Sequence, residues 1–320
     1  MIEVHELTKR YGDTLAVDRL SFTVQPGIVT GFLGPNGAGK TTTMRMILGL
    51  DAPTSGSVRV NGHAYRTIGA PLHEVGALID AKAANGGCTA YQHLRWLASA
   101  GGIPRTRIDE VLEIVGLSSV ANRRVGGFSL GMYQRLGIAA ALLGDPRILL
   151  FDEPMNGLDP EGIRWIRSLL KRLAGEGRTL LLSSHLMSEM EETADHIIVI
   201  SRGRLIADTS LAEFTQRSSG SHVRVVSPQG CDLVPLLERA GGAVISSAGG
   251  LTVTGIEAPQ IGQIAAANRI ELHELSPRRA TLESAFMELT EGTLEYQAAG
   301  ATTAESEQTG RQVAEMGARS

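Results

Sequence analysis

The sequence predicts an α/β fold in which a mostly parallel sheet carries a phosphate-binding loop and a small α+β domain follows. Apolar runs typical of buried strands alternate with helical segments across residues 29–200, which favours parallel strands joined by crossover helices. Between the run 29–33 and a helix predicted over 42–50 lies the octapeptide Gly34-Pro35-Asn36-Gly37-Ala38-Gly39-Lys40-Thr41. It matches the P-loop pattern G-x-x-x-x-G-K-[S/T], in the strand–loop–helix setting that this pattern requires.

The residue types in this P-loop predict that it binds a nucleoside triphosphate. Gly34, Gly37 and Gly39 let the backbone curl so that successive N–H groups face phosphate oxygens. The following helix adds the positive end of its dipole. Lys40 brings a positive charge to the β- and γ-phosphates, and the hydroxyl of Thr41 is a ligand for Mg²⁺. The alternative, a glycine-rich turn without a ligand, is disfavoured by a lysine and a threonine at these positions.

The composition is that of a soluble globular protein of 320 residues, with 42% hydrophobic and 20% charged residues. A net charge of −4 gives no reason to expect nucleic acid as a partner. Cys88 and Cys231 lie far apart in sequence, so a reducing cytosol is expected rather than a disulfide framework. We expect neither a signal peptide nor a membrane span, so any spans must belong to another chain.

The segments around the P-loop predict a small antiparallel sheet beside the nucleotide and, further on, a helical insert. Alternating segments over 2–7, 20–24 and 57–61 are of strand type. Tyr11 lies in the predicted loop between the first two; its spacing is that of an ordinary turn aromatic, although its ring could stack on adenine. Within the insert at 81–145, apolar residues recur at helical spacing over 91–100, 105–115 and 130–143.

Two buried strands are predicted downstream, and polar residues follow each of them. The run 148–151 leads into Asp152 and Glu153, and the run 179–184 leads into His185. Ligands of open α/β sheets bind at the carboxyl ends of the strands. We therefore expect Asp152 to hold Mg²⁺ through its water shell, Glu153 to align the attacking water, and His185 to contact the γ-phosphate. The alternatives are an acidic pair that merely ends a strand and a structural histidine.

A second domain is predicted after further strands at 196–200 and 204–207 and a boundary near 216–220. The expected elements are strand 222–226, helix 233–240, strands 243–247 and 251–254, helix 259–268, strand 270–274 and helix 281–290. This β-α-β-β-α-β order is that of a small ferredoxin-like domain over 221–290. Residues 297–320 contain almost no core-forming side chains and predict a disordered tail.

Over residues 1–215 the chain resembles the ATP-binding subunit of ABC transporters, because motifs of that family occur in the family's order. After the P-loop come Phe128-Ser-Leu-Gly-Met-Tyr-Gln-Arg135, Phe151-Asp-Glu-Pro154, Asn156-Gly-Leu-Asp159 and Ser183-Ser-His185. The resemblance is closest to the branch that exports drugs and antibiotics with an ABC-2 type permease. It implies a P-loop ATPase that powers export of a drug, an antibiotic or a similar small molecule, from the inner face of the cell membrane, through a separate polytopic permease.

The resemblance also implies roles for individual residues. Ser129 and Gly131 belong to the signature motif, which grips the γ-phosphate of ATP bound to the opposing copy; Ser129 can also N-cap the helix that begins there. Asp159 is the D-loop aspartate at the interface of a head-to-tail homodimer that encloses two ATP molecules with Mg²⁺. Thr42, directly after the P-loop, is counted with the ATP-binding residues. The family's catalytic glutamate, switch histidine and adenine-stacking aromatic correspond to Glu153, His185 and Tyr11.

Two positions depart from the family pattern. The signature, usually Leu-Ser-Gly-Gly-Gln, reads Phe128-Ser-Leu-Gly-Met132 here, so the phosphate-contacting Ser and second Gly remain. Asp80 stands where the family usually has the Q-loop glutamine, and a carboxylate is shorter and cannot donate as an amide does. Either Asp80 still reaches Mg²⁺ through water, or the coupling to the permease differs. The neighbouring loop 84–88 is either a permease contact or a plain surface loop.

Two other functions are compatible with the ATPase chemistry. A relative that acts on the ribosome or on DNA is disfavoured because the chain has one cassette, no long heptad coiled coil and no basic arm. A nucleotide-gated regulatory module that does not hydrolyse ATP is disfavoured by Glu153 and His185. The residues of the second domain do not distinguish a regulatory or dimerising module from a cap on the ATPase domain.

Overall fold

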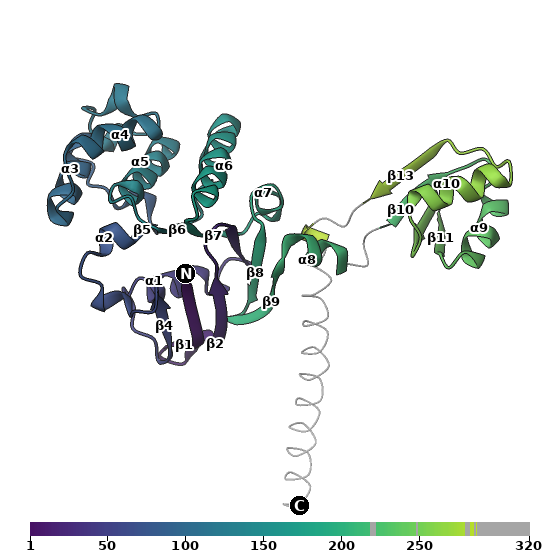
Figure 1. Ribbon diagram of the computed structural model, residues 1–320, viewed down its shortest axis with the longest axis horizontal. Coiled ribbons are helices and arrows are strands. Elements are labelled where there is room, and N and C mark those ends of the chain that lie inside the picture. Colours follow the sequence, from purple (N-terminus) through teal and green to yellow (C-terminus); the bar gives the residue numbers. More distant parts are fainter. Residues whose placement is uncertain (218–221, 248, 279–281, 285, 287–320) are drawn as a thin grey trace, which may run out of the picture. The chain divides into compact units, whose positions relative to one another are not determined.

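The computed structural model describes residues 1–217, 222–247, 249–278, 282–284 and 286. The chain divides into two compact units, Met1–Leu211 and Ala212–Ser320, both drawn in Figure 1. The predicted tail at 297–320 and most of the predicted helix at 281–290 lie outside the described residues.

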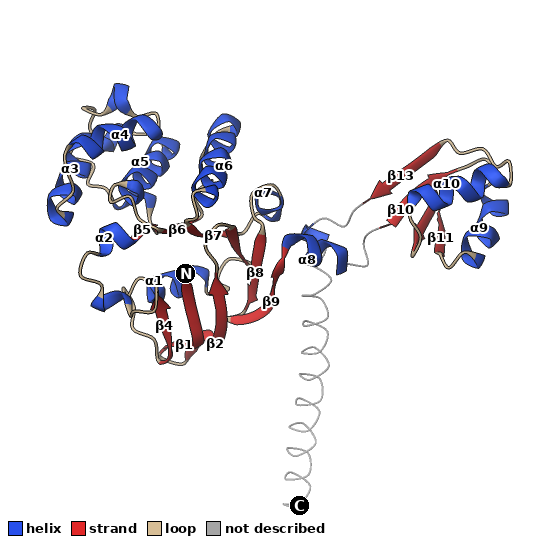
Figure 2. Cartoon of the chain, in the orientation of Figure 1, coloured by secondary structure: helices blue, strands red, loops and turns tan. Residues whose placement is uncertain are grey.

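A six-stranded sheet forms the centre of the first unit, with the strand order β5-β6-β7-β3-β8-β9 (Figure 2). The strands are β3 (Val29–Leu33), β5 (Val75–Leu78), β6 (Ile148–Asp152), β7 (Thr179–Ser184), β8 (His196–Ser201) and β9 (Arg204–Ser210). All neighbours pair in parallel except β8 and β9, which are antiparallel. The middle strands are buried on both faces, which explains their continuous apolar sequence. The predicted mostly parallel sheet is confirmed.

A three-stranded antiparallel sheet, of order β2-β1-β4, lies beside the first helix. Its strands are β1 (Ile2–Tyr11), β2 (Thr14–Val24) and β4 (Ser55–Val60), so β1 and β2 are longer than predicted. Their register shifts around Glu6 and Arg19, both with positive φ, and such bulges interrupt the alternation from which strands are read. Tyr11 is therefore the last residue of β1 rather than part of a loop.

One hydrophobic core joins both sheets to the helix that follows the P-loop, α1 (Lys40–Ile47). Phe22 of β2 and Phe32 of β3 meet in it with ring centroids 5.5 Å apart, and Met44 of α1 is fully buried in the same cluster. The P-loop thus follows directly on a closely packed core.

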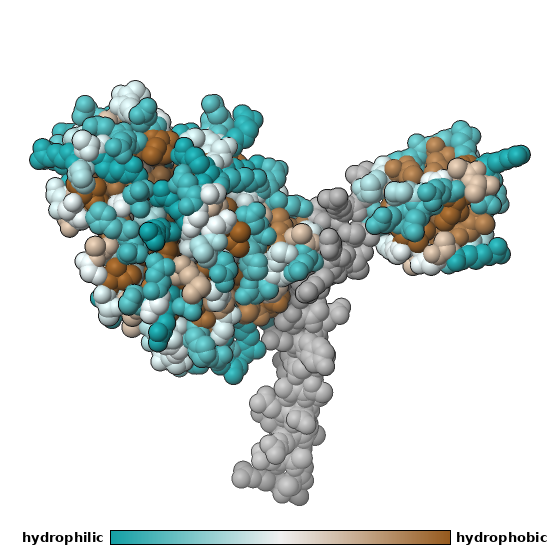
Figure 3. Space-filling view, viewed as in Figure 1, coloured by the Kyte–Doolittle hydropathy of each residue, from teal (hydrophilic) through white to brown (hydrophobic). Residues whose placement is uncertain are grey.

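On the face of the first unit seen in Figure 3, hydrophobic residues are scattered among hydrophilic ones.

The helices of the first unit lie mainly between β5 and β6 and after β6. The insert contains α3 (Ala90–Gly101), α4 (Thr106–Ile114) and α5 (Leu130–Leu142), each within one residue of its predicted bounds. The remaining helices are α2 (Pro71–Glu74), α6 (Pro160–Gly175) and α7 (Met187–Glu191), with short 3₁₀ helices η1 (Tyr65–Thr67), η2 (Ala81–Ala83), η3 (Ser118–Val120) and η4 (Val125–Gly127). The helix α8 (Leu211–Arg217) follows β9.

The described part of the second unit contains an antiparallel sheet of order β11-β12-β10-β13, together with helices. In chain order the elements are β10 (His222–Val226), α9 (Gly230–Arg239), β11 (Ala243–Ser247), β12 (Gly250–Thr254), α10 (Ala258–Ala267) and β13 (Glu274–Arg278). The strand predicted at 270–274 was wrong in position, because the Ile270 amide instead closes α10 by donating to the Ala265 carbonyl. Pro277 is tolerated in β13 because this strand lies at the edge of the sheet.

Candidate active site

Two glycines make the geometry of the P-loop possible. At Gly39, φ is +104°, and a Cβ atom there would lie 2.6 Å from the carbonyl oxygen of Ala16. At Gly34, a Cβ atom would lie 2.3 Å from the carbonyl oxygen of Ile200. Any side chain would collide with backbone at both places, so the loop can pass this close to β2 and β8 only as glycine. The β8–β9 turn also holds the loop, since the Gly203 amide donates to the Ala38 carbonyl at 3.0 Å.

A hollow of about 220 Å³ lies over this loop. Most of the predicted phosphate-binding residues line it, together with the carboxylate that follows β6 and one residue of β2. The lining residues are Ala16, Pro35, Asn36, Gly37, Ala38, Gly39, Lys40, Thr41, Thr42 and Glu153. Ala16 has no motif of its own and was missed by sequence reasoning, because only the packing of β2 against the P-loop brings it there.

Lys40 is held inside the P-loop by the loop's own carbonyl groups. Its side chain is 7% exposed, and Nζ donates to the carbonyl oxygens of Gly34 at 2.6 Å and Pro35 at 3.3 Å. Burial lowers the pKa of the Lys40 ammonium, while the charges of Glu153 and Asp152 act in the opposite direction. The Lys40 ammonium therefore lies at the hollow in a fixed position, where it can bind an anionic ligand.

The end of β6 meets the start of α1 through Asp152. Thr41 Oγ1 donates to Asp152 Oδ2 at 2.5 Å, and the Ser183 hydroxyl donates to Oδ1. Parallel pairing of β6 with β7 puts Asp152 opposite Ser183, which explains the second bond. A hydroxyl and a carboxylate side by side are a donor set that suits Mg²⁺ together with phosphate oxygens and water. Ser183 belongs to the motif that ends at His185, but the sequence alone predicts no role for it.

Both the backbone and the carboxylate of Glu153 are fixed by neighbours. Its φ of +50° is uncommon for a residue other than glycine. The Glu153 amide donates to Ser183 Oγ at 2.9 Å, and its carbonyl accepts from Gln134 Nε2 at 3.3 Å. Its Oε1 lies 3.7 Å from Lys40 Nζ, and its Oε2 lies 2.9 Å from His185 Nδ1. The lysine that begins α1, the glutamate that follows β6 and the histidine that follows β7 thus converge at one point.

Tyr11 lies beside the first turn of α1, with a side chain that is 48% exposed. Its hydroxyl donates to Asp51 Oδ2 at 3.0 Å, and Lys9 Nζ lies 4.8 Å from the ring centroid. Partial burial and the bond to Asp51 raise the pKa of the Tyr11 phenol, whereas a hydrogen bond with Thr42 lowers it. Arg45 also pairs with Asp51, through Nε at 2.8 Å, so the ring is anchored at its hydroxyl end. Asp51 and Arg45 carry no motif and were missed.

The signature and D-loop residues lie together but do not line the hollow over the P-loop of their own chain. Ser129 caps α5 by accepting from the Met132 amide at 3.3 Å, as predicted from its position. Asp159 caps α6 by accepting from the Gly162 amide at 2.8 Å. A Cβ atom on Gly131 would lie 3.1 Å from the carbonyl oxygen of Gly157, so the two capped helices begin side by side.

Asp80 lies after β5 and caps the short helix η2. Its Oδ1 accepts from the Lys82 amide at 2.8 Å, the side chain is exposed, and it does not line the hollow. The predicted contact of Asp80 with Mg²⁺ stays a prediction. The loop that follows is held against the residues before the signature, since Gly126 and Val125 donate to the carbonyls of Gly86 and Cys88.

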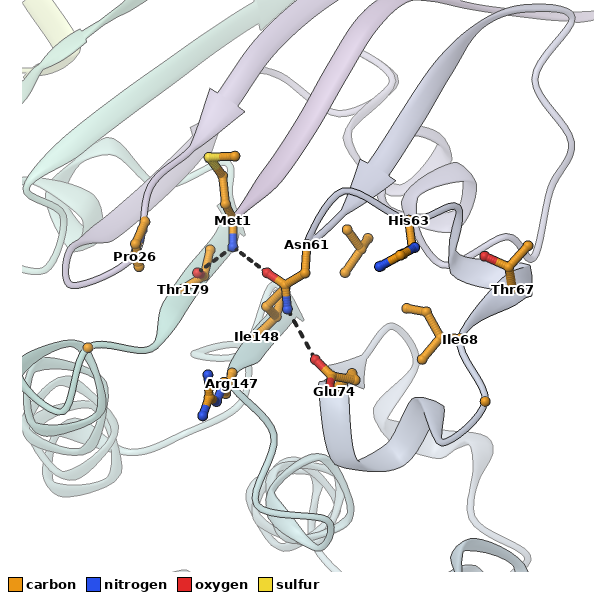
Figure 4. Close-up of a pocket in the computed structure, with 13 residues that line it drawn as sticks. Met1, Pro26, Asn61, His63, Thr67, Ile68, Glu74, Arg147, Ile148 and Thr179 are labelled. Atoms are coloured by element: carbon orange, nitrogen blue, oxygen red, sulfur yellow. Dashed lines mark hydrogen bonds between the residues drawn. The ribbon is translucent and has the colours of Figure 1, made fainter.

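A second and larger cavity, of about 640 Å³, lies at the amino ends of β6 and β7, beside residues Ile148 and Thr179 (Figure 4). Figure 4 shows the Met1 ammonium bonded to Asn61 and Thr179, and Asn61 bonded in turn to Glu74. None of the predicted phosphate-binding residues lines it. The smaller hollow at the carboxyl ends of the strands is therefore the candidate active site.

Comparisons with known proteins agree with this geometry. The family described as "ABC transporter" matches residues 17–156, and a domain of unknown function (DUF8746) matches residues 221–283. The bacitracin transport ATP-binding protein BcrA of Enterococcus faecalis is 42% identical over 221 residues, which cover 68% of this chain and 72% of BcrA. The chain belongs to the ABC transporter family. An uncharacterized ABC transporter ATP-binding protein of Bacillus subtilis, YhcH, is 37% identical over 92% of this chain and 97% of its own length.

Solved structures of ABC ATPases share the fold. An ATP-binding subunit of an ABC transporter is 27% identical with a TM-score of 0.62, and the match covers 68% of this chain and 92% of that one. The cassette MJ0796, in a dimeric post-hydrolysis state bound to ADP and Pi, is 26% identical with a TM-score of 0.60 over 66% of this chain and 99% of its own. The predicted family and fold are confirmed, and this ABC subunit binds and hydrolyses ATP.

Among the residues that the structure describes, no helix combines the length and the apolar character needed to cross a lipid bilayer.

Proposed function

We propose that this ABC ATPase, with Mg²⁺, powers export of an antibiotic or a similar small molecule through a separate membrane permease. The observation that carries the ATPase part is the convergence of Lys40, Glu153 and His185 beside the P-loop. The substrate class is supported by relatives named for bacitracin transport and, in Streptococcus pyogenes, for lantibiotic transport. The permease would hold the chain at the inner face of the membrane.

The proposed chemistry is transfer of the γ-phosphoryl group of ATP to water, giving ADP and phosphate. The P-loop amides and Lys40 bind the β- and γ-phosphates. Thr41 and Asp152 would hold Mg²⁺, which would supply charge neutralisation at those phosphates. Glu153 aligns the attacking water and accepts its proton. His185, bonded to the carboxylate of Glu153, orients that base and contacts the γ-phosphate.

The proposed active unit is a head-to-tail homodimer. Ser129, Gly131 and Asp159 lie away from the hollow of their own chain, which supports their serving the ATP of an opposing copy. The dimeric structure of the ATP-binding cassette MJ0796 supports dimerisation. The γ-phosphate would then favour the closed dimer, and its loss would reopen it.

The proposed domain division places the ATPase at 1–215 and a small accessory domain at 221–290. The strand order β11-β12-β10-β13, with all neighbours antiparallel, supports a ferredoxin-like arrangement for the described part of this domain.

The partner can be tested by a tagged pull-down from detergent-solubilised membranes of the native host, with mass spectrometry of the bound proteins. We expect one stoichiometric polytopic partner, and loss of resistance to its substrate when either gene is deleted. The tag alone serves as the control. Recovery of ribosomal proteins or nucleic acid in place of a membrane protein would contradict the transport assignment and leave the ATPase activity standing.

For Tyr11, we expect the Tyr11→Ala variant to bind ATP about tenfold more weakly, because base–aromatic stacking contributes about 1–3 kcal/mol. Tyr11→Phe, which loses the hydroxyl bond to Asp51 and keeps the ring, should keep most of the affinity. Isothermal titration calorimetry measures both. Equal affinities for the wild type and Tyr11→Ala would remove Tyr11 from the adenine site.

A further inference from the structure

We propose that Gln134 is a positioning residue that fixes the conformation of Glu153 and links it to the signature helix α5. The proposal rests on the proposed function, in which Glu153 is the catalytic base. Gln134 lies in the second turn of α5 with a side chain that is 5% exposed. Its Nε2 donates to the Glu153 carbonyl at 3.3 Å.

The backbone of Glu153 needs such a partner because its φ of +50° is a conformation that residues with a side chain rarely adopt. On one side, β7 holds the Glu153 amide through Ser183 Oγ at 2.9 Å. On the other side, α5 holds the carbonyl through Gln134. Loss of the second bond would let this peptide relax and turn the carboxylate away from Lys40 and His185.

The Oε1 atom of Gln134 indicates that this residue does more than fill a volume in the core. Its Oε1 is buried and has no hydrogen-bond partner among the described residues. A buried acceptor without a partner lowers stability, and an apolar side chain of the same length would fill this space without that loss. Among the described residues, the bond from Nε2 to the Glu153 carbonyl is the one hydrogen bond that the Gln134 side chain makes, and an apolar residue cannot supply it.

The helix that carries Gln134 is held as a rigid element. The neighbouring Arg135 places its guanidinium 4.4 Å from the ring centroid of Trp165 in α6 and donates to the Val115 carbonyl at 2.9 Å. Trp165 Nε1 donates to the Ile114 carbonyl at 3.3 Å, so α5, α6 and the end of α4 meet at one point. A displacement of Ser129 at the start of α5 would therefore move Gln134 as well.

This connection makes Gln134 a link between the two ATP sites of the dimer. Ser129 would contact ATP bound to the opposing copy, while Gln134 on the same helix holds the Glu153 that acts on the chain's own ATP. Closure of the site that contains Ser129 would thereby position Glu153 in the other site. The hydrogen bond from Gln134 that transmits this effect can be removed without changing a residue that contacts nucleotide.

The first test is Gln134→Met, which keeps the volume and removes the donor. We expect kcat to fall about 30-fold with KM for ATP within about threefold, because the base is displaced while the phosphate contacts remain. The matched control is Gln92→Met on α3, whose exposed side chain accepts from the Thr89 amide away from the site.

The second test is Gln134→Glu, which is isosteric and donates only when it is protonated. At high pH its carboxylate would repel the Glu153 carbonyl, and at low pH the acid would donate to it. The ratio of variant to wild-type kcat should therefore rise as the pH falls from about 8.5 to about 6, since burial raises a carboxyl pKa. The same ratio for Gln134→Met should stay flat, and so should that for Gln92→Glu.

Turnover and ATP-dependent dimerisation of the wild type are measured in the same experiment. A failure of the proposed function can then be distinguished from a failure of the proposed role of Gln134. A wild-type chain that neither dimerises nor hydrolyses ATP would contradict the proposed function. If the wild type is active and Gln134→Met keeps kcat within about twofold, or loses only ATP affinity, the role of Gln134 is overturned. Should Gln134→Met fold poorly in a thermal melt, the pH ratio of Gln134→Glu decides, and a flat ratio overturns the proposal.

Discussion

The Glu153→Gln variant is expected to bind ATP and remain as an ATP-bound dimer, with a turnover at least about 100-fold below that of the wild type. The amide keeps the size of the carboxylate but cannot accept a proton from the attacking water. The carbonyl of residue 153 accepts from Gln134 and its amide donates to Ser183, and these backbone bonds survive the change. ATP would therefore stay intact, and the γ-phosphate would hold the dimer closed.

Phosphate release and size-exclusion chromatography with MgATP measure the two parts of this result. The matched control is Glu113→Gln, the same change at an exposed position of α4, which should leave both unchanged. Hydrolysis by Glu153→Gln near the wild-type rate would mean that another group activates the water. If Glu153→Gln loses turnover but forms no stable dimer with MgATP, the proposed homodimer is contradicted instead.

The Lys40→Ala variant is expected to lose ATP affinity by about 100-fold or more, because charge-assisted bonds to phosphate are lost at a largely buried position. Lys40 also bonds the carbonyls of Gly34 and Pro35, so its removal loosens the P-loop itself. Lys40→Arg keeps the charge, yet we expect it to bind poorly too, since the space around Nζ is closed by those carbonyls.

Calorimetric titration with MgATP and with MgADP measures this effect. Lys171→Ala, which removes an exposed lysine of α6, is the matched control and should bind as the wild type does. Affinity unchanged in Lys40→Ala would remove Lys40 from the phosphate site. A loss for ATP much larger than for ADP would place the lysine mainly at the γ-phosphate.

Sequence patterns were sufficient wherever a structural requirement is local. The P-loop needs glycine at Gly34 and Gly39 because backbone carbonyl oxygens of other strands lie too close for a side chain there. The fixed spacing of these glycines can be recognised in the sequence. Helical spacing in the insert located α3, α4 and α5 to within a residue, since α3 and α4 each bury one face along their own length and α5 is largely apolar and buried from its second turn on. Ser129 was likewise predictable as a cap, because the cap and the amide it accepts from are neighbours in sequence.

Only the tertiary structure decided which distant residues act together. The sheet order places β6 beside β7 and β7 beside β3, and this brings Asp152, Ser183 and the P-loop to one edge. The hydrogen bonds that Glu153 makes with Gln134 and Ser183, and that Tyr11 makes with Asp51, join segments whose own sequences carry no sign of the partner. Such contacts depend on strand order and helix packing, which arise from burial summed over the whole domain. Local motifs therefore identified the ATPase chemistry, while the packing of α5 and β7 determines how Glu153, the proposed catalytic base, is held.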